Sequence, residues 1–310
     1  MTLHRRDFLK TASFAAVSAA TAAAAAETLK PGLNAYSFNK LLNDAIRQRG
    51  PGITLDGVLD FAAKCKFAAF DPTGYFFPGY PKVPADSYVD SLKKHAADLG
   101  IALSGTGVRN NFTTADKDVR AAGVAHIKEW VEVAARLGVP VIRVFADTQM
   151  RAQSWQTVSN GASRKDVLDW ISSALRECAD HATKFRVKIG VQNHGDFLAT
   201  ADQHLELIKA VGSEWCGPIV DTGYFKTPDP YVDIAMVAPH AVNWQVKQSV
   251  FGEESEVPTD MIRLLKIVRK SGYKGYLPIE TLSPQGKLYD PFTVIPSFLG
   301  QLREAIAKTA

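Results

Sequence analysis

Polar residues at the ends of four successive apolar runs are the side chains in this sequence best suited to chemistry. The runs IGVQ, GPIVD, VNWQ and LPIE end in Gln192, Asp221, Gln245 and Glu280, and Lys247 follows two residues after Gln245. A buried strand does not normally finish on such a side chain unless a polar partner meets it there. Four consecutive polar ends, each able to ligate a cation or to hydrogen-bond a sugar hydroxyl, predict one shared site.

Short apolar runs alternate with longer amphipathic stretches along the whole chain, and this alternation predicts how those ends are positioned. The stretches, such as RKDVLDWISSALRECADHATKF, carry apolar residues at helical spacing. Eight strand–helix pairs predict an α/β fold, a (β/α)8 TIM barrel, whose active site lies at the C-terminal ends of the strands. A doubly wound open sheet is the alternative, but NAYSFNKLL, at the end of the first run, lacks the glycine fingerprint usual there. The apolar runs cover residues 33–38, 67–71, 101–106, 139–145, 187–192, 217–221, 241–247 and 276–280.

The first 26 residues have the pattern of a twin-arginine export signal. Arg5-Arg6 precede an Ala-rich stretch that ends in small residues before Glu27. The stretch is too short and too rich in alanine for a membrane span, which needs roughly 20 strongly apolar residues. An ordinary N-terminal helix is the alternative. We therefore expect a leader over residues 1–26, a barrel domain over 27–310, and a periplasmic or secreted protein.

Charge and cysteine content exclude several classes of partner. The whole chain has a formal net charge of +4, and the leader carries half of it, so the remainder is close to neutral. This balance predicts no nucleic-acid partner and, after cleavage of the leader, no membrane surface. Cys65, Cys178 and Cys216 form no CxxC motif, and we interpret them as small packed side chains rather than a disulfide framework.

The chain resembles the xylose isomerase-like TIM barrels, also known as the sugar phosphate isomerase/epimerase superfamily. The resemblance spans the chain after the leader and is most specific in IGVQNHGDF, GPIVDTGYF, VNWQVK and LPIET. In that family the four strand ends are usually Glu, Asp, His and Glu and bind one divalent cation, often manganese, zinc, cobalt or magnesium. Members isomerise or epimerise sugars, cleave sugar linkages, or nick damaged DNA.

Two of the four family positions match and two depart from the pattern. Asp221 and Glu280 match, whereas Gln192 replaces a glutamate and Gln245 replaces a histidine. Lys247 fits a lysine common two residues after that histidine. The resemblance thus implies a metal site made of Asp221, Glu280, Gln192 and Gln245, an all-oxygen set that suits hard ions such as Mg²⁺ or Mn²⁺. The alternative is that both glutamines bind substrate hydroxyls and no metal is held.

The departures also bear on catalysis. Family epimerases use glutamates at the fifth and eighth strand ends as two bases, and an amide such as Gln192 cannot accept a proton at neutral pH. Glu280 remains as one base, and His194 is a candidate for the second function if it points inward. One carboxylate suffices for abstraction beside a carbonyl followed by β-elimination, with Gln192 and Lys247 stabilising the enolate oxygen. A hydrogen-bonded structural role is the alternative for His194.

Further candidates come from other strand ends. Arg143, in VIRVF, is a charge within a strand and needs a partner, for which Asp71 is a candidate. Tyr36, together with Phe76 and Phe77, could form an aromatic platform for a sugar, and Asn110 could bind hydroxyls or make a turn. Tyr224, in DTGYF, replaces a histidine found there in several epimerases, and we expect Tyr224 and Arg143 to bind substrate. Trp244 should point to the opposite face from Gln245, into the core.

Three readings of function follow from these residues. The first is an exported sugar isomerase or epimerase that abstracts a proton next to a carbonyl, or a related lyase acting on 3-oxo-glycosides. The second is a sugar-binding barrel without catalysis, which the two glutamines suggest. The third, a DNA-repair endonuclease, is disfavoured by the near-neutral charge and the missing histidines. The expected partner is a small carbohydrate, and homo-oligomer formation stays open.

Overall fold

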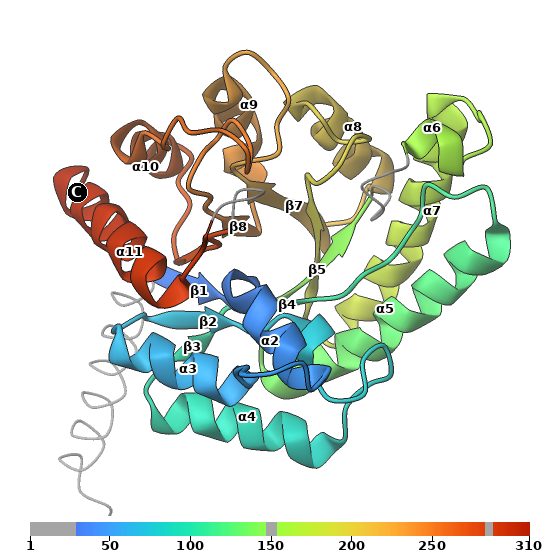
Figure 1. The fold of residues 1–310 in the computed structure, drawn as a ribbon. Helices are drawn as coiled ribbons and strands as arrows, with labels where there is room; N and C mark the ends of the chain where they lie inside the picture. The colour runs from blue at the N-terminus through green and yellow to red at the C-terminus, as the bar shows by residue number, and fades with distance from the viewer. Residues whose placement is uncertain (1–28, 147–153, 283–287) are drawn as a thin grey trace, which may run out of the picture.

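The computed structural model describes residues 29–146, 154–282 and 288–310, so the expected leader lies outside the described residues. Figure 1 shows the strands at the centre and the helices around the outside. The strands are β1 (Lys30–Asn34), β2 (Ala69–Asp71), β3 (Ala102–Leu103), β4 (Thr106–Gly107), β5 (Val141–Phe145), β6 (Lys188–Gln192), β7 (Cys216–Asp221), β8 (Asn243–Gln245) and β9 (Tyr276–Ile279).

The α-helices alternate with the strands. They are α2 (Asn39–Ile46), α3 (Leu55–Lys64), α4 (Asp86–Asp98), α5 (Lys117–Leu137), α6 (Trp155–Val158), α7 (Arg164–Thr183), α8 (Ala201–Val211), α9 (Pro230–Val237), α10 (Met261–Lys270) and α11 (Pro291–Lys308). Short 3-10 turns are η1 (Ala35–Phe38), η2 (Gly74–Phe76) and η3 (Ala238–His240).

All strand pairings are parallel and follow one another around a ring. One sheet has the order β3-β2-β1-β9 and the other β4-β5-β6-β7-β8. The third run is interrupted at Ser104-Gly105, which divides it into β3 and β4. A bridge between Val246 and Ile279 joins β8 to β9, so the two sheets complete the ring. The predicted (β/α)8 barrel is confirmed.

Hydrophobic burial and helix caps account for this arrangement. Every residue of β5 and β7 is buried, as parallel strands covered by helices require. Polar caps begin the helices: the side chains of Thr54, Asp116, Ser163 and Thr200 each accept a backbone N–H from the first turn of α3, α5, α7 and α8. Trp244 is fully buried, as its position opposite Gln245 predicts.

Two apolar runs end earlier or are broken for local reasons. The first run was expected to reach residue 38, but the N–H of Tyr36 donates to Asn34 Oδ1 at 2.8 Å and turns the chain into η1. At Gly105 a Cβ would lie 2.8 Å from Asp71 Oδ2 and 2.9 Å from Asn243 Nδ2. This close approach inside the barrel requires glycine and coincides with the break between β3 and β4.

Within the described residues, no helix is long and apolar enough to cross a membrane. The three cysteines are free thiols. Burial raises the pKa of Cys178 and of Cys216 to about 12, which makes both thiols inert packing groups at neutral pH.

Candidate active site

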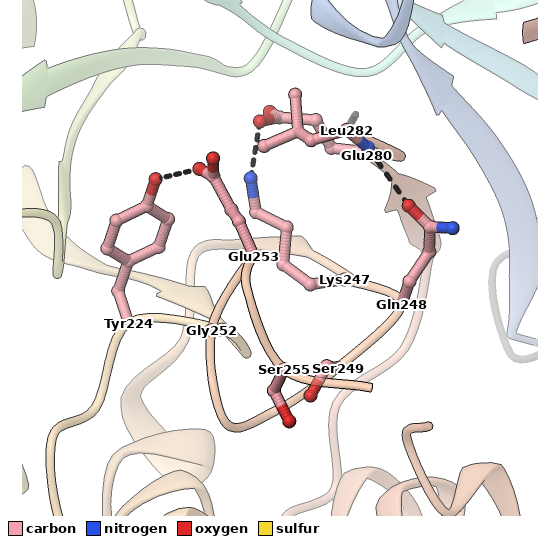
Figure 2. Close-up of a pocket in the computed structure, with 10 residues that line it drawn as sticks. Tyr224, Lys247, Gln248, Ser249, Gly252, Glu253, Ser255, Glu280 and Leu282 are labelled. Atoms are coloured by element: carbon pink, nitrogen blue, oxygen red, sulfur yellow. Dashed lines mark hydrogen bonds and ion pairs between the residues drawn. The ribbon is translucent and has the colours of Figure 1, made fainter. Parts of the chain in front are cut away.

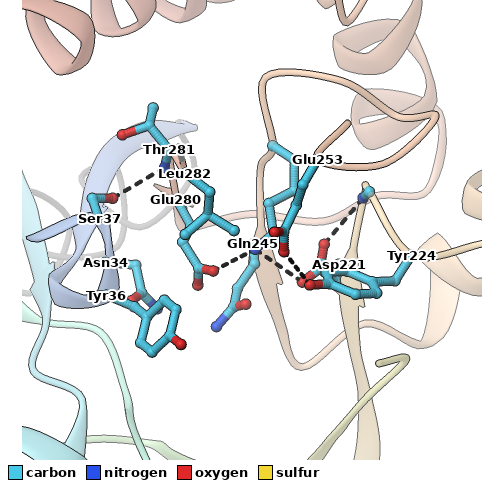
Figure 3. A network of polar contacts seen from close by, with 12 residues as sticks. Asn34, Tyr36, Ser37, Asp221, Tyr224, Gln245, Glu253, Glu280, Thr281 and Leu282 are labelled. Atoms are coloured by element: carbon cyan, nitrogen blue, oxygen red, sulfur yellow. Dashed lines mark hydrogen bonds and ion pairs between the residues drawn. The ribbon is translucent and has the colours of Figure 1, made fainter. Parts of the chain in front are cut away.

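The C-terminal ends of β6, β7, β8 and β9 meet in a buried polar cluster at the mouth of the barrel. Gln192, Asp221, Gln245, Lys247 and Glu280 are all 4% exposed or less. Figure 3 shows Asp221, Gln245 and Glu280 converging from different strands. The structure therefore brings together the five residues that the strand-end pattern singled out.

Lys247 links the two carboxylates of this cluster. Its Nζ forms an ion pair and hydrogen bond with Glu280 Oε1 and lies 3.4 Å from Asp221 Oδ2. Burial acts to lower the pKa of Lys247, but the charges of Asp221 and Glu280 outweigh it and the pKa is raised. Lys247 is therefore a permanent cation between two acids.

Asp221 is surrounded by donors as well as by charge. Its Oδ2 accepts from Gln192 Nε2 at 2.5 Å, and its Oδ1 accepts from the N–H of Gly223 at 3.0 Å. Burial raises the pKa of Asp221, and the cation of Lys247 opposes that rise. The donors stabilise the ionised form that burial alone would disfavour.

Arg143 lies on the other side of both glutamines. Its Nη1 donates to Gln192 Oε1 at 3.0 Å, and its Nη2 donates to the hydroxyl of Tyr75 at 3.2 Å. No ion pair joins it to Asp71 within the parts of the chain described, so the expected partner contributes only longer-range attraction. That attraction is visible on Asp71, where burial raises the pKa to about 6 and Arg143 limits the rise.

The orientation of the Gln245 amide follows from its neighbours, because amide oxygen and nitrogen are assigned from hydrogen-bond partners. With Nε2 toward the acids, it donates to Glu280 Oε2 at 3.0 Å and approaches Asp221 Oδ2 at 3.3 Å. Oε1 then accepts from Arg143 and Asn34, each at 3.1 Å. The reverse orientation satisfies Gln192 Nε2 at 2.9 Å but turns the amide nitrogen toward two donors and its oxygen toward two acids. The first orientation places the amide nitrogens of Gln192 and Gln245 2.9 Å apart, but it satisfies both acids and both other donors and is therefore favoured.

A cavity of about 270 Å³ opens above the cluster, close to the lower end of the range of roughly 300–1,000 Å³ for small-molecule sites. Of the residues expected at the site, it is lined by Tyr36, Arg143, Gln192, His194, Tyr224 and Glu280. Its other lining residues include Tyr75, Arg109, Phe145 and Glu253. Aromatic walls with a few polar groups suit the apolar faces and the hydroxyls of a sugar.

His194 does face this cavity, as its candidate role requires. Its ring stacks on Tyr224 with centroids 4.2 Å apart and meets the edge of Phe145 at 5.3 Å. Two neighbours in IGVQNHGD have structural roles instead. The side-chain amide of Asn193 pairs with the backbone of Asp221 at 2.8 and 2.9 Å, and Asp196 accepts the N–H of Trp155 that opens α6.

A second, smaller cavity adjoins the first and shares Tyr224, Glu253, Glu280 and Leu282 with it. Figure 2 shows Lys247 reaching Glu280 and Tyr224 reaching Glu253 around this space. Lys247 thus contacts Glu280 from the wall of the smaller cavity and does not line the larger one. Asp221 and Gln245 line neither cavity and act from beneath Glu280 and Gln192.

Asn110 is placed away from the cavity. Its side-chain amide bonds the backbone of Phe145 on both sides, donating at 2.6 Å and accepting at 2.8 Å. Phe76 and Phe77 are likewise buried, and the neighbouring Tyr75 supplies the aromatic wall. The sequence-based search considered only residues at strand ends, so it missed the cavity residues Tyr75, Arg109 and Glu253, which lie on connecting segments. Their aromatic and charged character in loops at the barrel mouth was the available signal.

The donor set does not fit a divalent metal. Among the described residues, no group of three or more His, Cys, Asp or Glu side chains could hold an ion. Asp221 and Glu280 share the ammonium of Lys247, and Gln192 turns its amide N–H toward Asp221 rather than its carbonyl oxygen. Carboxylate and carbonyl oxygens are the ligands that hard cations need, and here they are engaged by protein donors.

The ring of eight strand positions with its polar C-terminal mouth defines a TIM barrel of the kind that carries its active site at that face. The sequence profile of the xylose isomerase-like TIM barrel family matches residues 59–303. The chain therefore belongs to this family.

Solved structures share the fold at low sequence identity. L-ribulose 3-epimerase is 18% identical, with a TM-score of 0.70, covering 91% of this chain and 97% of that chain. D-psicose 3-epimerase in the presence of D-fructose is 18% identical, with a TM-score of 0.66 and coverages of 90% and 98%. 3-keto-D-glucoside 4-epimerase from E. coli is 15% identical, with a TM-score of 0.66 and coverages of 89% and 99%. No curated protein sequence gives a significant match.

Proposed function

We propose that the protein is a sugar isomerase or epimerase that removes a proton from the carbon next to a carbonyl group. The observation that carries the proposal is the position of Glu280. Glu280 lines an aromatic-walled cavity, and its carboxylate is held by Lys247 and by the amide of Gln245, neither of which lines that cavity. A fixed carboxylate facing a cavity suited to a sugar is what proton abstraction beside a carbonyl requires. Several structures with this fold are named as sugar epimerases, which supports the same substrate class.

Arg143 is the group best placed to stabilise the oxygen that becomes negative when the proton leaves. It lines the same cavity as Glu280, and its hydrogen bonds to Gln192 and Tyr75 fix the guanidinium there. A preorganised donor aimed at developing charge lowers the barrier without rearrangement. Lys247 and the amide of Gln192, the sequence-based candidates for this role, are engaged with Glu280 and Asp221 instead.

The proton that completes an isomerisation or epimerisation needs a second group. His194 lines the cavity from the segment after β6, and two strands, β7 and β8, separate it from Glu280 around the ring. Tyr224 and Glu253, whose side chains hydrogen-bond to one another, line it as well. We assign the second proton transfer to His194, because Tyr224 packs along its ring and fixes its orientation.

Cleavage of a 3-oxo-glycoside by β-elimination is the second candidate reaction. It needs one carboxylate to remove the proton beside the carbonyl, and the electron pair then expels the glycosidic oxygen. The observation that favours it is Gln192, an amide at the position where a two-base epimerase has its other glutamate. Both reactions share the first step at Glu280 and differ in the fate of the enolate.

Solvent deuterium exchange tests the shared step. The protein is incubated in D₂O with D-fructose, D-psicose, L-ribulose and a 3-keto-glucoside, and proton NMR follows the C–H next to each carbonyl. We expect exchange or product with at least one sugar, and loss of it in Glu280→Gln, which keeps the shape but cannot accept the proton. Epimers indicate the isomerase reaction and a released aglycone indicates the lyase. A ligand-induced rise in melting temperature without exchange by the wild type would instead support a sugar-binding barrel.

We also infer export by the twin-arginine route from the Arg5-Arg6 leader. Mass spectrometry of the exported protein should find an N-terminus at or near Glu27. Replacing both arginines by lysine should retain the protein in the cytoplasm. An uncleaved protein that stays inside the cell would contradict the inference.

A further inference from the structure

Lys247 has the surroundings of a built-in cation site. Its side chain is 6% exposed, and its ammonium lies between carboxylates from two different strands. The family pattern has a divalent ion held by carboxylates of these strand ends. In this protein the position between Asp221 and Glu280 carries a covalently attached charge instead.

The backbone around Lys247 fixes where that charge lies. The N–H of Lys247 donates to Thr222 Oγ1 at 2.9 Å, and its carbonyl accepts from Thr259 Oγ1 at 2.9 Å. At Gly223 a Cβ would lie only 2.9 Å from Lys247 Cγ, so the lysine stem runs through space that glycine leaves open. Three neighbours therefore direct the ammonium to the acids.

The two amides complete the replacement of a metal. Arg143 donates to the carbonyl of Gln192 at 3.0 Å and lies 3.1 Å from the carbonyl of Gln245 in its favoured orientation. Since both carbonyl oxygens face Arg143, the amide nitrogen of Gln192 faces Asp221 and that of Gln245 faces Glu280 and Asp221. The oxygens that a metal would need point away from the acids.

Charge and hydrogen-bond capacity leave little for a divalent ion to gain. The two cations Lys247 and Arg143 already balance Asp221 and Glu280, and each of the four carboxylate oxygens has a protein donor. Adding two positive charges beside the buried cations Lys247 and Arg143 is unfavourable unless a resident cation leaves.

We propose that Lys247 takes the place of the divalent metal in this protein, so that its active site is complete without one. Lys247 acts as a positioning residue: it holds the carboxylate of Glu280 in place and compensates its charge without lining the substrate cavity. The proposal concerns the proposed catalytic site, but its test measures metal binding and does not depend on turnover.

The experiment is titration of the full protein with Mn²⁺ and, separately, Mg²⁺, followed by calorimetry and by melting temperature. We expect the wild type to show no saturable binding up to about 1 mM metal and no metal-dependent rise in melting temperature. Lys247→Met removes the ammonium and leaves two adjacent acids, so we expect at least tenfold tighter Mn²⁺ binding and a melting temperature that rises with metal. Lys165→Met, at an exposed lysine paired with Asp169, is the matched control and should behave as the wild type.

The wild-type titration decides the matter even if Lys247→Met does not fold. About one Mn²⁺ or Mg²⁺ per chain with micromolar affinity would overturn the proposal, and so would a folded Lys247→Met variant that binds metal no better than the wild type. Failure of deuterium exchange would count against the proposed function and leave this result untouched, so the two can be told apart.

Discussion

Gly107 controls the position of Arg143, and substituting it offers a sharp test of the site. Gly107 pairs with Arg143 across β4 and β5, and the arginine side chain passes over it. In Gly107→Ala the new Cβ would lie 2.6 Å from Arg143 Nε and 2.9 Å from its Nη2. Non-bonded heavy atoms prefer separations of roughly 3.5–4.0 Å, so the guanidinium must move by about 1 Å.

The size of the effect follows from what the guanidinium loses. Overpacking of this kind costs about 1–3 kcal/mol, and each hydrogen bond made by a charged group contributes about 1.5–3 kcal/mol. Arg143 holds Gln192 and Tyr75 through such bonds, at 3.0 and 3.2 Å. We therefore expect Gly107→Ala to lower the free energy of unfolding by about 3 kcal/mol and to reduce deuterium exchange strongly, because the donor for the developing oxyanion is displaced.

Denaturant unfolding measures the first effect, and the exchange assay measures the second. Gly300→Ala is the matched control: no atom lies within 4 Å of the position of its Cβ, and it lies within helix α11. There alanine should stabilise the protein by up to about 1 kcal/mol. If Gly107→Ala has the same unfolding midpoint and the same activity as the wild type, then Arg143 does not depend on this space and the reasoning is wrong.

Three further outcomes are expected. Gln192→Glu exchanges an amide donor 2.5 Å from Asp221 for a second acid. A thermal melt should therefore show a loss of stability, and the exchange assay should show a fall in turnover. Increased epimerisation would mean instead that the amide had limited two-base chemistry. Arg109 lies over the ring of Tyr75, 4.6 Å from its centroid, on the cavity wall, and has no acidic partner in the described structure. Arg109→Ala should therefore raise KM with little change in kcat. An unchanged KM would exclude contact between Arg109 and the substrate. Burial lowers the pKa of His204 to about 4, so the unfolded chain takes up a proton at this histidine before the folded protein does as pH falls. Between pH 6.5 and 4 the wild type should therefore lose about 3 kcal/mol of stability relative to His204→Gln. Urea unfolding measures this difference, and parallel curves of stability against pH for the two proteins would contradict it.

The proposal that Lys247 replaces the metal also explains why this protein has glutamine at two positions where family members carry ionisable ligands. With Lys247 directed at Glu280, a glutamate in place of Gln192 would lie beside Asp221 without a donor between them. The amide avoids that repulsion and supplies the donor. The two departures from the family pattern and the inward lysine thus form one consistent arrangement.

The alternation of apolar runs and amphipathic stretches was sufficient to predict the barrel. Periodicity reports which faces are buried, and eight strand–helix pairs leave few ways to bury them all. The same pattern placed Gln192, Asp221, Gln245 and Glu280 together, because the C-terminal ends of parallel strands lie on one side of a barrel. These predictions depend only on local sequence and on the geometry of the fold.

Other features depended on contacts between segments far apart in the chain. Asn110 reads as a polar loop residue in the sequence, but the backbone of Phe145, on the neighbouring strand, takes up its amide. Tyr75, Arg109 and Glu253 reach the cavity from connections whose course no periodicity encodes. The orientation of Gln245 and the role of Lys247 depend on Arg143, Asn34 and Glu280, which come from three other strands or strand ends. The sequence by itself determined which side chains gather at the barrel mouth; only the tertiary structure decided which atoms face one another, because hydrogen-bond direction and charge pairing depend on distances of a few tenths of an ångström.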